Sequence, residues 1–296
     1  HMSSKIRLYT ALAGVDFSTS SKEDLELLFH TILNAGIHGI SFSAYLDHQA
    51  PGSQISEEQI APKFDIIKPY VQWVRSFSCT DGNQHIPRIA HEKGLKTLVG
   101  AWLGTDVKKN EDEIAGVIQV AKAGYADIVA VGNEVMLRED LTEDQILDFI
   151  QRVKQELPGI SVGYVDAYYE FELHPRIVDA CDVILANCYP FWESCPLEHS
   201  LVYLKEMYRR AVKAAKGKKV IIAETGWPDR GTPENGAVPS YENALKYFIN
   251  TFTWAAEESI EVFYFSSFDE IWKVDVEGDV GAYWGLWDKN GKMKYG

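Results

Sequence analysis

Short apolar runs alternate with longer amphipathic segments along nearly the whole chain, and this alternation limits the fold more than any other feature. Strand and helix patterns that alternate without a break in composition indicate one α/β domain, and eight such units are typical of a (β/α)8, or TIM, barrel. A run that is apolar throughout, such as residues 219–224, is expected of a parallel strand buried on both faces. The predicted strands are residues 39–45, 71–78, 96–102, 127–133, 161–167, 182–189, 219–224 and 261–268.

An open, doubly wound sheet is the structural alternative to the barrel. That fold usually carries a glycine-rich phosphate-binding turn after its first strand, and the sequence has no such turn. Between the strands, residues 143–157 place Ile146 and Val153 at helical spacing, and Thr142 with Gln145 predicts a capping box at the start of this helix. The sequence therefore favours the barrel.

The first 38 residues are surplus to an eight-stranded pattern. His1-Met2 is typical of a cloning remnant, so we expect residues 1–4 to be a disordered start and residues 5–296 to form one domain. A ninth apolar run lies at residues 8–17. Together with a predicted helix at residues 23–34, it is expected to cover one end of the barrel, although it could instead be the true first strand.

The charge and the composition limit the class of partner. The formal net charge of −14 disfavours nucleic acid or an anionic membrane as the main partner, because both repel an acidic surface. No apolar run approaches the roughly 20 residues of a membrane span. We expect a monomer that acts on a neutral partner and is exported, with a signal that lies outside this sequence.

The cysteines and histidines do not predict a metal or redox site. Cys188 and Cys195 could form a disulfide in an exported protein, but four free thiols are the preferred interpretation. The histidines form no cluster with ligand spacing. Asp275, Glu277 and Asp279 alternate in a loop, but they lack the full set of oxygen ligands that calcium requires. We therefore expect no metal and no organic cofactor.

Two carboxylates follow predicted strands that are apolar throughout, at the place where a barrel strand ends and its loop begins. Glu134 ends the run IVAVGN, and Glu224 ends the run VIIA. They lie 90 residues apart, which is about three βα units. A single glutamate is most often a solvated surface charge, but two at strand ends are predicted to face each other across the barrel mouth. Such a pair can cleave an acetal, with one carboxyl as acid and the other meeting the developing positive charge.

Other polar and aromatic side chains also follow the predicted strands. Catalytic and binding groups of a barrel lie at the carboxyl ends of its strands, and aromatic faces stack on the apolar faces of sugars. Arg75 could be an orienting charge in the cleft or a buried partner of a carboxylate, and the cleft is preferred. Of Trp102, Trp192, Trp227 and Trp272, we assign two to the core. The candidate binding residues at strand ends are Tyr45, Arg75, Trp102, Asn133, Asn187, Tyr189, Trp227 and Glu270.

Taken together, several short motifs resemble glycoside hydrolase family 17, the β-1,3-glucanase family, in its bacterial and fungal branch. They occur in the family's order and span roughly residues 39 to 290, which is nearly the whole chain. The motifs are FSAY at residues 42–45, VRSFS at 74–78, VGNE at 131–134, NCYPF at 187–191, ETGWP at 224–228 and FDEIWK at 268–273.

The resemblance implies a clan-A type glycoside hydrolase barrel that works with retention. It assigns Glu134 as the acid/base and Glu224 as the nucleophile. It also implies that Asn133 contacts the sugar 2-hydroxyl and that Tyr189 lies near the nucleophile. The resemblance also places Glu270 and Lys273 among the polar residues of the cleft. The chain departs from the family pattern in its N-terminal extension and in the acidic loop at residues 274–285, which leaves the number of sugar subsites open.

We therefore predict a retaining endo-β-1,3-glucanase that hydrolyses a laminarin-like glucan. A β-1,3-glucan transglycosylase with the same two glutamates is the nearest alternative, and a glucan-binding protein without turnover is a more distant one. Retention requires the two carboxyls to lie about 5–5.5 Å apart. It also requires Glu134 to be protonated and Glu224 to be ionised. We expect apolar surroundings to keep the proton on Glu134. We expect a hydrogen bond from Tyr189 and the charge of Arg75 to keep Glu224 ionised.

Overall fold

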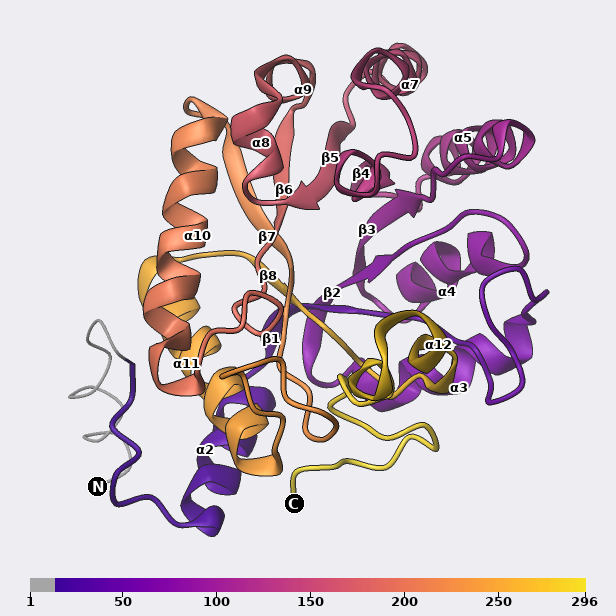
Figure 1. Ribbon diagram of the computed structural model, residues 1–296. Helices are drawn as coiled ribbons and strands as arrows, with labels where there is room; N and C mark the ends of the chain where they lie inside the picture. The colour runs from indigo at the N-terminus through magenta and orange to yellow at the C-terminus, as the bar shows by residue number, and fades with distance from the viewer. Residues whose placement is uncertain (1–13) are drawn as a thin grey trace.

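A computed structural model, which describes residues 14–296, shows eight parallel strands that close into a barrel in the order of the sequence (Figure 1). This confirms the predicted (β/α)8 fold. The first barrel strand is β1, so the alternative that residues 8–17 form the first strand is wrong. The strands are β1 Ile37–Ser41, β2 Val71–Ser76, β3 Lys96–Ala101, β4 Ile128–Asn133, β5 Ser161–Ala167, β6 Val183–Asn187, β7 Lys219–Thr225 and β8 Val262–Tyr264.

The predicted limits of the last strand were too long. The regular strand ends at Tyr264, and the ladder is then interrupted at Ser266, whose N–H donates to Trp284 O, while Ser267 N–H donates to Ser41 O. These bonds connect the segment after β8 to a later loop and to the end of β1. Distant partners of this kind leave no local signal in the sequence.

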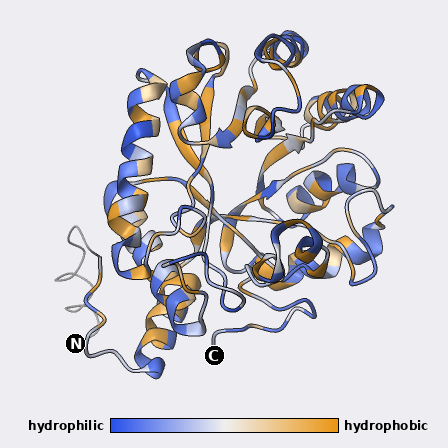
Figure 2. Ribbon diagram, in the orientation of Figure 1, coloured by the Kyte–Doolittle hydropathy of each residue, from blue (hydrophilic) through white to orange (hydrophobic). Residues whose placement is uncertain are grey.

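Helices surround the barrel and cover its outer face (Figures 1 and 2). The capping box predicted at Thr142 and Gln145 is present at the start of α7. The longer helices are α2 Lys22–Asn34, α3 Glu57–Ile67, α4 Ile86–Glu92, α5 Val107–Lys122, α7 Glu143–Glu156, α9 Pro175–Ala180, α10 Ser200–Ala215 and α11 Tyr241–Glu258. Short turns of helix are α6 Val135–Arg138, α8 Glu170–Leu173, α12 Val274–Glu277, η1 Asn83–His85, η2 Leu197–His199, η3 Ile271–Lys273 and η4 Asp279–Ala282.

Two layers of apolar side chains hold the barrel together. Alternate strand residues such as Leu98, Val165 and Ile221 form one cluster, while their neighbours pack under the helices in a second, larger cluster. Both faces of the strands are therefore buried, which explains why the strand sequences are apolar throughout. Phe263 belongs to the first cluster, and Gly39 makes room for it, since a Cβ there would lie 2.6 Å from the Phe263 ring.

The N-terminal helix does not cover an end of the barrel, contrary to the sequence-based expectation. Helix α2 lies beside α11 in the outer ring, where the Phe29 and Phe248 rings pack with centroids 4.6 Å apart (Figure 1). Within the described residues, the chain after β8 forms only the short turns η3, α12 and η4. The apolar face of α2 therefore covers the part of the barrel that a helix after β8 would otherwise cover. Residues 1–4, and residues 8–13 of the ninth apolar run, lie outside the described residues.

A buried ion-pair cluster fastens the C-terminal segment to the loops at the barrel mouth. Lys294 Nζ lies 2.6 Å from Asp229 Oδ1 and 2.8 Å from Asp269 Oδ1, and all three side chains are nearly inaccessible to solvent. Asp229 belongs to the loop after β7, and Asp269 to the loop after β8. The cluster thereby connects two loops that border the end of the barrel where Glu224 lies.

Candidate active site

Glu134 occupies a strained turn at the end of β4. Its backbone is left-handed, with φ of 54° and ψ of 31°, and Gly132 two residues earlier also has a positive φ. A left-handed backbone costs a residue with a Cβ roughly 1–2 kcal/mol, and such strain gathers at functional sites. The Glu134 N–H is satisfied by Val165 O on β5 at 2.9 Å. Its carboxyl lines a pocket at the barrel mouth.

Glu224 is held from two sides near the end of β7. The Tyr189 hydroxyl donates to Glu224 Oε1 at 2.7 Å, and Arg75 Nη1 donates to Glu224 Oε2. Both contacts were expected from the sequence, and both favour the charged carboxylate. Arg75 Nη2 also donates to Asn133 Oδ1 at 2.9 Å. Arg75 is therefore a buried partner of a carboxylate, and that carboxylate is the candidate nucleophile itself.

The two glutamates line one pocket of about 350 Å³, a volume that includes its open mouth. Aromatic rings form much of the wall, so one side of a bound sugar ring would meet apolar surface. The lining residues are Glu134, Tyr189, Trp192, Glu224, Phe265, Glu277 and Trp284.

The electrostatic environments of the two glutamates differ. Burial, together with the charges of Glu224 and Asp166, raises the pKa of Glu134 to about 8, against the lowering effect of Arg138 and Arg75. Glu134 is therefore protonated at neutral pH. Glu224 has a cation and a hydroxyl donor on its oxygens. One carboxyl can give a proton while the other offers an electron pair.

Two residues that line the pocket each carry a buried polar atom that has no hydrogen-bond partner among the described residues. The two atoms are Glu277 Oε2, on α12, and Trp284 Nε1, in the loop that follows η4. Buried polar atoms are normally paired, so these two are left for a partner that the described residues do not supply, such as water or a hydroxyl group. Burial raises the pKa of Glu277, and the charges of Glu224 and Glu270 act in the same direction, against Lys273. The carboxyl therefore lies within the electrostatic reach of the candidate nucleophile.

Sequence reasoning did not assign Phe265, Glu277 and Trp284 to the site. Phe265 fell within a run predicted as strand, and the other two lie in the acidic loop that was only expected to reshape one end of the cleft. Glu277 gave no better signal than its neighbour Asp275, because spacing in a loop does not tell which carboxylate turns inward. Trp192 was recognised as flanking a strand end, and it lines the pocket.

Three of the predicted binding residues gather beside the pocket on the side of the loops after β1 and β8. Lys273 Nζ lies over the Phe265 ring at 3.8 Å and 3.7 Å from Glu270 Oε1. Glu270 also accepts a hydrogen bond from Trp272 Nε1 at 2.7 Å, and the Trp272 ring meets Tyr45 edge to face. Tyr45, Glu270 and Lys273 thus form a polar and aromatic border that continues from Phe265.

Asn187 is not among the residues that line the pocket. Its Nδ2 is 3.5 Å from Asn133 Oδ1, and both side chains are buried. The Asn133 oxygen is also the acceptor for Arg75. The two asparagines and the arginine therefore form one buried network under the two glutamates.

The two other predicted tryptophans are not among the residues that line the pocket. Trp227 is a core residue: it is 2% exposed, packs against Phe191 and Tyr247, and donates through Nε1 to Val238 O. Neither of its ring faces is available to a sugar, which corrects the expectation of a binding role. Trp102 is 39% exposed, with the Arg138 guanidinium 4.8 Å from its ring centroid.

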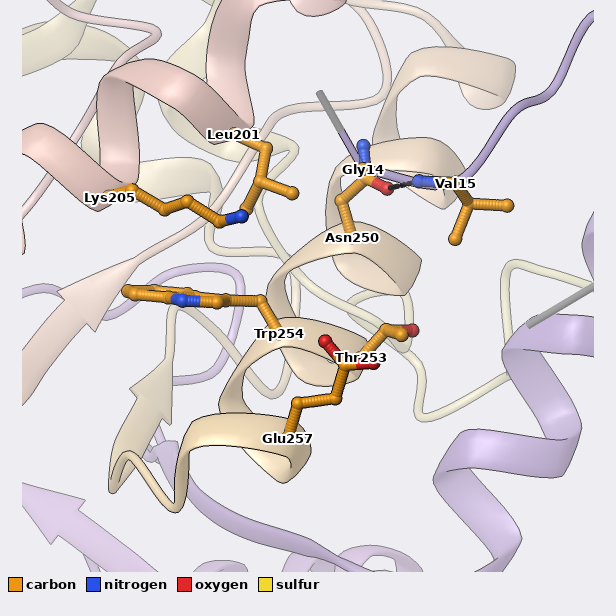
Figure 3. Close-up of a pocket in the computed structure, with 8 residues that line it drawn as sticks. All are labelled: Gly14, Val15, Leu201, Lys205, Asn250, Thr253, Trp254 and Glu257. Carbon is orange, nitrogen blue, oxygen red and sulfur yellow. Dashed lines mark hydrogen bonds between the residues drawn. The ribbon is translucent and has the colours of Figure 1, made fainter. Parts of the chain in front are cut away.

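A second small cavity lies away from the barrel mouth, between α10, α11 and the segment at Gly14 and Val15 (Figure 3). Val15 N–H donates to Asn250 Oδ1 at 2.9 Å across its edge. The cavity has room of about 10 Å³ for a water-sized molecule, which is about one water. It is too small for a sugar.

Other features of the described residues bear on metals, thiols and membranes. All four cysteines are free and buried, in agreement with the preferred interpretation. Within residues 14–296, no group of three or more His, Cys, Asp or Glu side chains is arranged to hold a metal ion. In the same part of the chain, none of the helices combines the length and apolarity needed to cross a bilayer.

Known proteins resemble this chain over most of its length. A glucan 1,3-β-glucosidase of Arthroderma benhamiae is 28% identical over 301 residues, which cover 94% of this chain and 96% of the relative. A cell surface mannoprotein of Candida albicans is 26% identical and is matched over 86% of this chain and 67% of its own length. Among solved structures, a family 17 β-1,3-glucanosyltransferase of Rhizomucor miehei superposes with a TM-score of 0.79 at 26% identity, over 88% of this chain and 96% of the other.

The strongest assignment comes from the family comparison. Residues 39–285 match the BtgE/BtgC glycoside hydrolase domain, and this segment runs from β1 to the loop that carries Trp284. It contains both glutamates and every side chain that lines their pocket. The chain therefore belongs to the BtgE/BtgC glycoside hydrolase domain family, within glycoside hydrolase family 17, and is an O-glycosyl hydrolase.

Proposed function

We propose that this protein cleaves β-1,3-glucosidic bonds by a retaining double displacement, with Glu224 as nucleophile and Glu134 as acid/base. One observation carries the proposal: two carboxyls with opposite electrostatic environments line the same pocket. The choice of β-1,3-glucan as substrate is supported by relatives named glucan 1,3-β-glucosidase and β-1,3-glucanosyltransferase.

In the first step a Glu224 oxygen attacks the anomeric carbon. The bond from that carbon to the departing glucosyl oxygen breaks, and the oxygen takes the proton of Glu134. The products are a glucosyl ester on Glu224, an ionised Glu134 and a shortened glucan with a new hydroxyl. Arg75 and Tyr189 hold the attacking carboxylate in place and keep it from collecting the proton meant for the leaving group.

In the second step Glu134 acts as a base. It takes a proton from a water molecule, whose oxygen attacks the anomeric carbon and displaces Glu224 from the ester. Both carboxyls return to their starting states, and the sugar keeps its configuration. Side chains and water supply every proton and electron pair, so the reaction as written uses no metal and no cofactor. Retention predicts a carboxyl separation of about 5–5.5 Å.

The pocket walls suit a glucosyl unit. Trp192, which is only partly buried, offers aromatic surface for its apolar face. Glu277 Oε2 can accept from a sugar hydroxyl, and Trp284 Nε1 can donate to one. A sugar hydroxyl both donates and accepts, so it can pair with either of these two atoms. We also assign substrate contacts to Asn133, Tyr45, Glu270 and Lys273.

We propose cleavage within the glucan chain rather than from its end. One side of the pocket continues into the side chains of Tyr45, Trp272 and Lys273, which supports binding of more than one sugar unit. A timed digest of laminarin tests this proposal. Early release of oligosaccharides of intermediate length is expected, whereas steady release of one small sugar would favour cleavage from the end.

Glucosyl transfer to a sugar is the second candidate, and the Rhizomucor transferase favours it because it is similar over 88% of this chain. In that reaction a glucan hydroxyl replaces water in the second step. Incubation with one purified laminari-oligosaccharide separates the two activities, since transfer yields products longer than the starting chain. Binding without any cleavage would instead favour a non-catalytic glucan-binding protein.

The roles of the two glutamates are tested with Glu224→Ala and Glu134→Ala. Each change is expected to lower kcat on laminarin by about a thousandfold or more. Added azide separates the roles. It attacks in place of Glu224 and gives the α-glucosyl azide, but it replaces water in the Glu134 variant and gives the β-glucosyl azide. Glu139→Gln, an exposed neighbour, is the matched control. Full activity of Glu224→Ala would end the assignment.

We further propose that residues 5–296 form one catalytic unit, because the strands from Ile37 to Tyr264 close a single barrel. We propose that it is monomeric, which light scattering of the purified protein would check. We also propose export. This is supported by the similarity to a protein named a cell surface mannoprotein, and fractionation of the native host tests it.

A further inference from the structure

The turn that carries Glu134 lacks its usual cap. Glu134 immediately precedes the helical turn α6 Val135–Arg138, where a side chain normally accepts hydrogen bonds from the first N–H groups of the helix. The Glu134 side chain makes no such bond. Its carboxyl lines the pocket instead. Left-handed residues flank α6 on both sides, at Glu134 and Glu139, so this short segment needs support from elsewhere.

That support comes from the neighbouring strand β5. The Tyr164 hydroxyl accepts from Met136 N–H at 2.9 Å and donates its own proton to Asp166 Oδ2. Asp166 Oδ1 accepts from Ala167 N–H at 2.8 Å, and the Leu137 N–H on α6 also helps to lower the pKa of the Asp166 carboxyl. Asp166 is fully buried and Tyr164 is nearly so. A buried carboxylate thus caps the turn from outside its own segment.

We propose that Asp166 and Tyr164 are positioning residues for the acid/base: they cap α6 from β5, so that the Glu134 carboxyl is free to face the substrate. The inference rests on the proposed function of Glu134. Neither residue lines the pocket, and neither has a role in the reaction described above. A change in their hydrogen bonds would shift the strained Glu134 backbone, and a misplacement of about 1 Å can lower a rate by about a hundredfold.

The charge of Asp166 adds a second effect. Burial raises the pKa of Asp166 to about 6, against the lowering effect of its bonds to Tyr164 and Ala167, so it is charged at neutral pH. This charge helps to keep the proton on Glu134. The other groups with an electrostatic effect on Glu134 are Glu224 on β7, Arg75 on β2 and Arg138 on α6. Tyr189 and Tyr169 are neutral, and near Asp166 the charged Glu170 pairs with His174.

The test compares Asp166→Asn and Tyr164→Phe on two substrates. Laminarin has a poor leaving group that needs the Glu134 proton. A 2,4-dinitrophenyl β-laminaribioside has a leaving group that departs without one. For both variants we expect kcat on laminarin to fall by about ten- to a hundredfold. On the aryl glycoside, kcat/KM is expected to stay close to the wild-type value. If the two residues had a purely structural role, the rates on both substrates would fall alike, and that result would overturn the inference.

The pH profile separates the two effects. Asp166→Asn removes a negative charge, so the alkaline limb of kcat/KM on laminarin should move to lower pH. Tyr164→Phe keeps the Asp166 carboxyl, so its limb should move less than that of Asp166→Asn while its laminarin rate falls. Tyr164→Phe also keeps the test valid if the asparagine variant does not fold. Wild-type laminarin rates in both variants would refute the inference.

Failure of the proposed function would look different. If Glu134→Gln keeps its activity on laminarin, the acid/base assignment itself is wrong. If Glu134→Gln is inactive on laminarin while Asp166→Asn and Tyr164→Phe are unimpaired, only the positioning role fails. The two outcomes cannot be confused, because the first is measured on Glu134 alone.

Discussion

Replacing Glu134 by glutamine should stabilise the protein at alkaline pH while it abolishes acid catalysis. The pKa of Glu134 is about 8 in the folded protein, against an ordinary value of 4.5. The unfolded chain therefore loses this proton near pH 4.5, whereas the folded protein keeps it until about pH 8. The stability supplied by the protonated side chain is complete below pH 4.5 and is lost as the pH rises to about 8.

The size of the effect follows from the same two pKa values. Each pKa unit corresponds to about 1.4 kcal/mol, so the upper limit is ~5 kcal/mol. Water in the open pocket and the shared titration with Glu224 reduce this limit. We expect Glu134→Gln to raise the free energy of unfolding by about 2–3 kcal/mol at pH 9 relative to the wild type. At pH 4.5 the two proteins should differ little, because both then carry a neutral side chain.

Equilibrium unfolding in urea at pH 4.5 and pH 9 measures the effect. Glu139→Gln, an exposed left-handed residue of the same segment, is the control and should change little at either pH. As an independent check, kcat/KM of the wild type on laminarin should fall above about pH 8, where Glu134 loses its proton. Equal stability of variant and wild type at pH 9 would refute the argument, as would a stabilisation of the same size at pH 4.5.

Two further predictions concern the loops at the barrel mouth. Glu277→Ala should lower kcat/KM on laminarin by about ten- to a hundredfold, since it removes an acceptor for a sugar hydroxyl, whereas the exposed Asp275→Ala should have little effect. Equal losses in steady-state assays would count against a substrate contact. Lys294→Met should lower the free energy of unfolding by about 3–5 kcal/mol, because it removes the buried cation that Asp229 and Asp269 share. Urea unfolding checks this value, with Lys292→Met at an exposed position as the control. Similar unfolding midpoints for the two variants would contradict the prediction.

The barrel could be predicted from the sequence because its strands are marked locally. A strand buried on both faces must be apolar throughout, and the runs at β4 and β7 meet that condition and then stop at Glu134 and Glu224. Strand ends in a barrel converge on one rim, so the meeting of the two glutamates follows from the topology without any knowledge of the loops. The Arg75 and Tyr189 contacts to Glu224 follow in the same way, since both residues lie at strand ends.

The positions that sequence reasoning missed depend on loop conformation and on partners far along the chain. Trp227 follows a strand end as Tyr189 does, but its loop turns the ring into the core against Tyr247. Glu277 turns into the pocket while Asp275 faces solvent, although both lie in one acidic segment. Helix α2 lies in the outer ring because the chain after β8 leaves that position open.

By itself, the sequence determined the barrel, the rim on which the chemistry lies and the two carboxyls that face each other there, because these follow from apolar runs and the points where they end. Only the tertiary structure decided which side chains complete the pocket and how the two carboxyls come to differ. Burial, the Arg75 contact and the cap that Asp166 supplies from β5 all depend on groups brought together from separate strands.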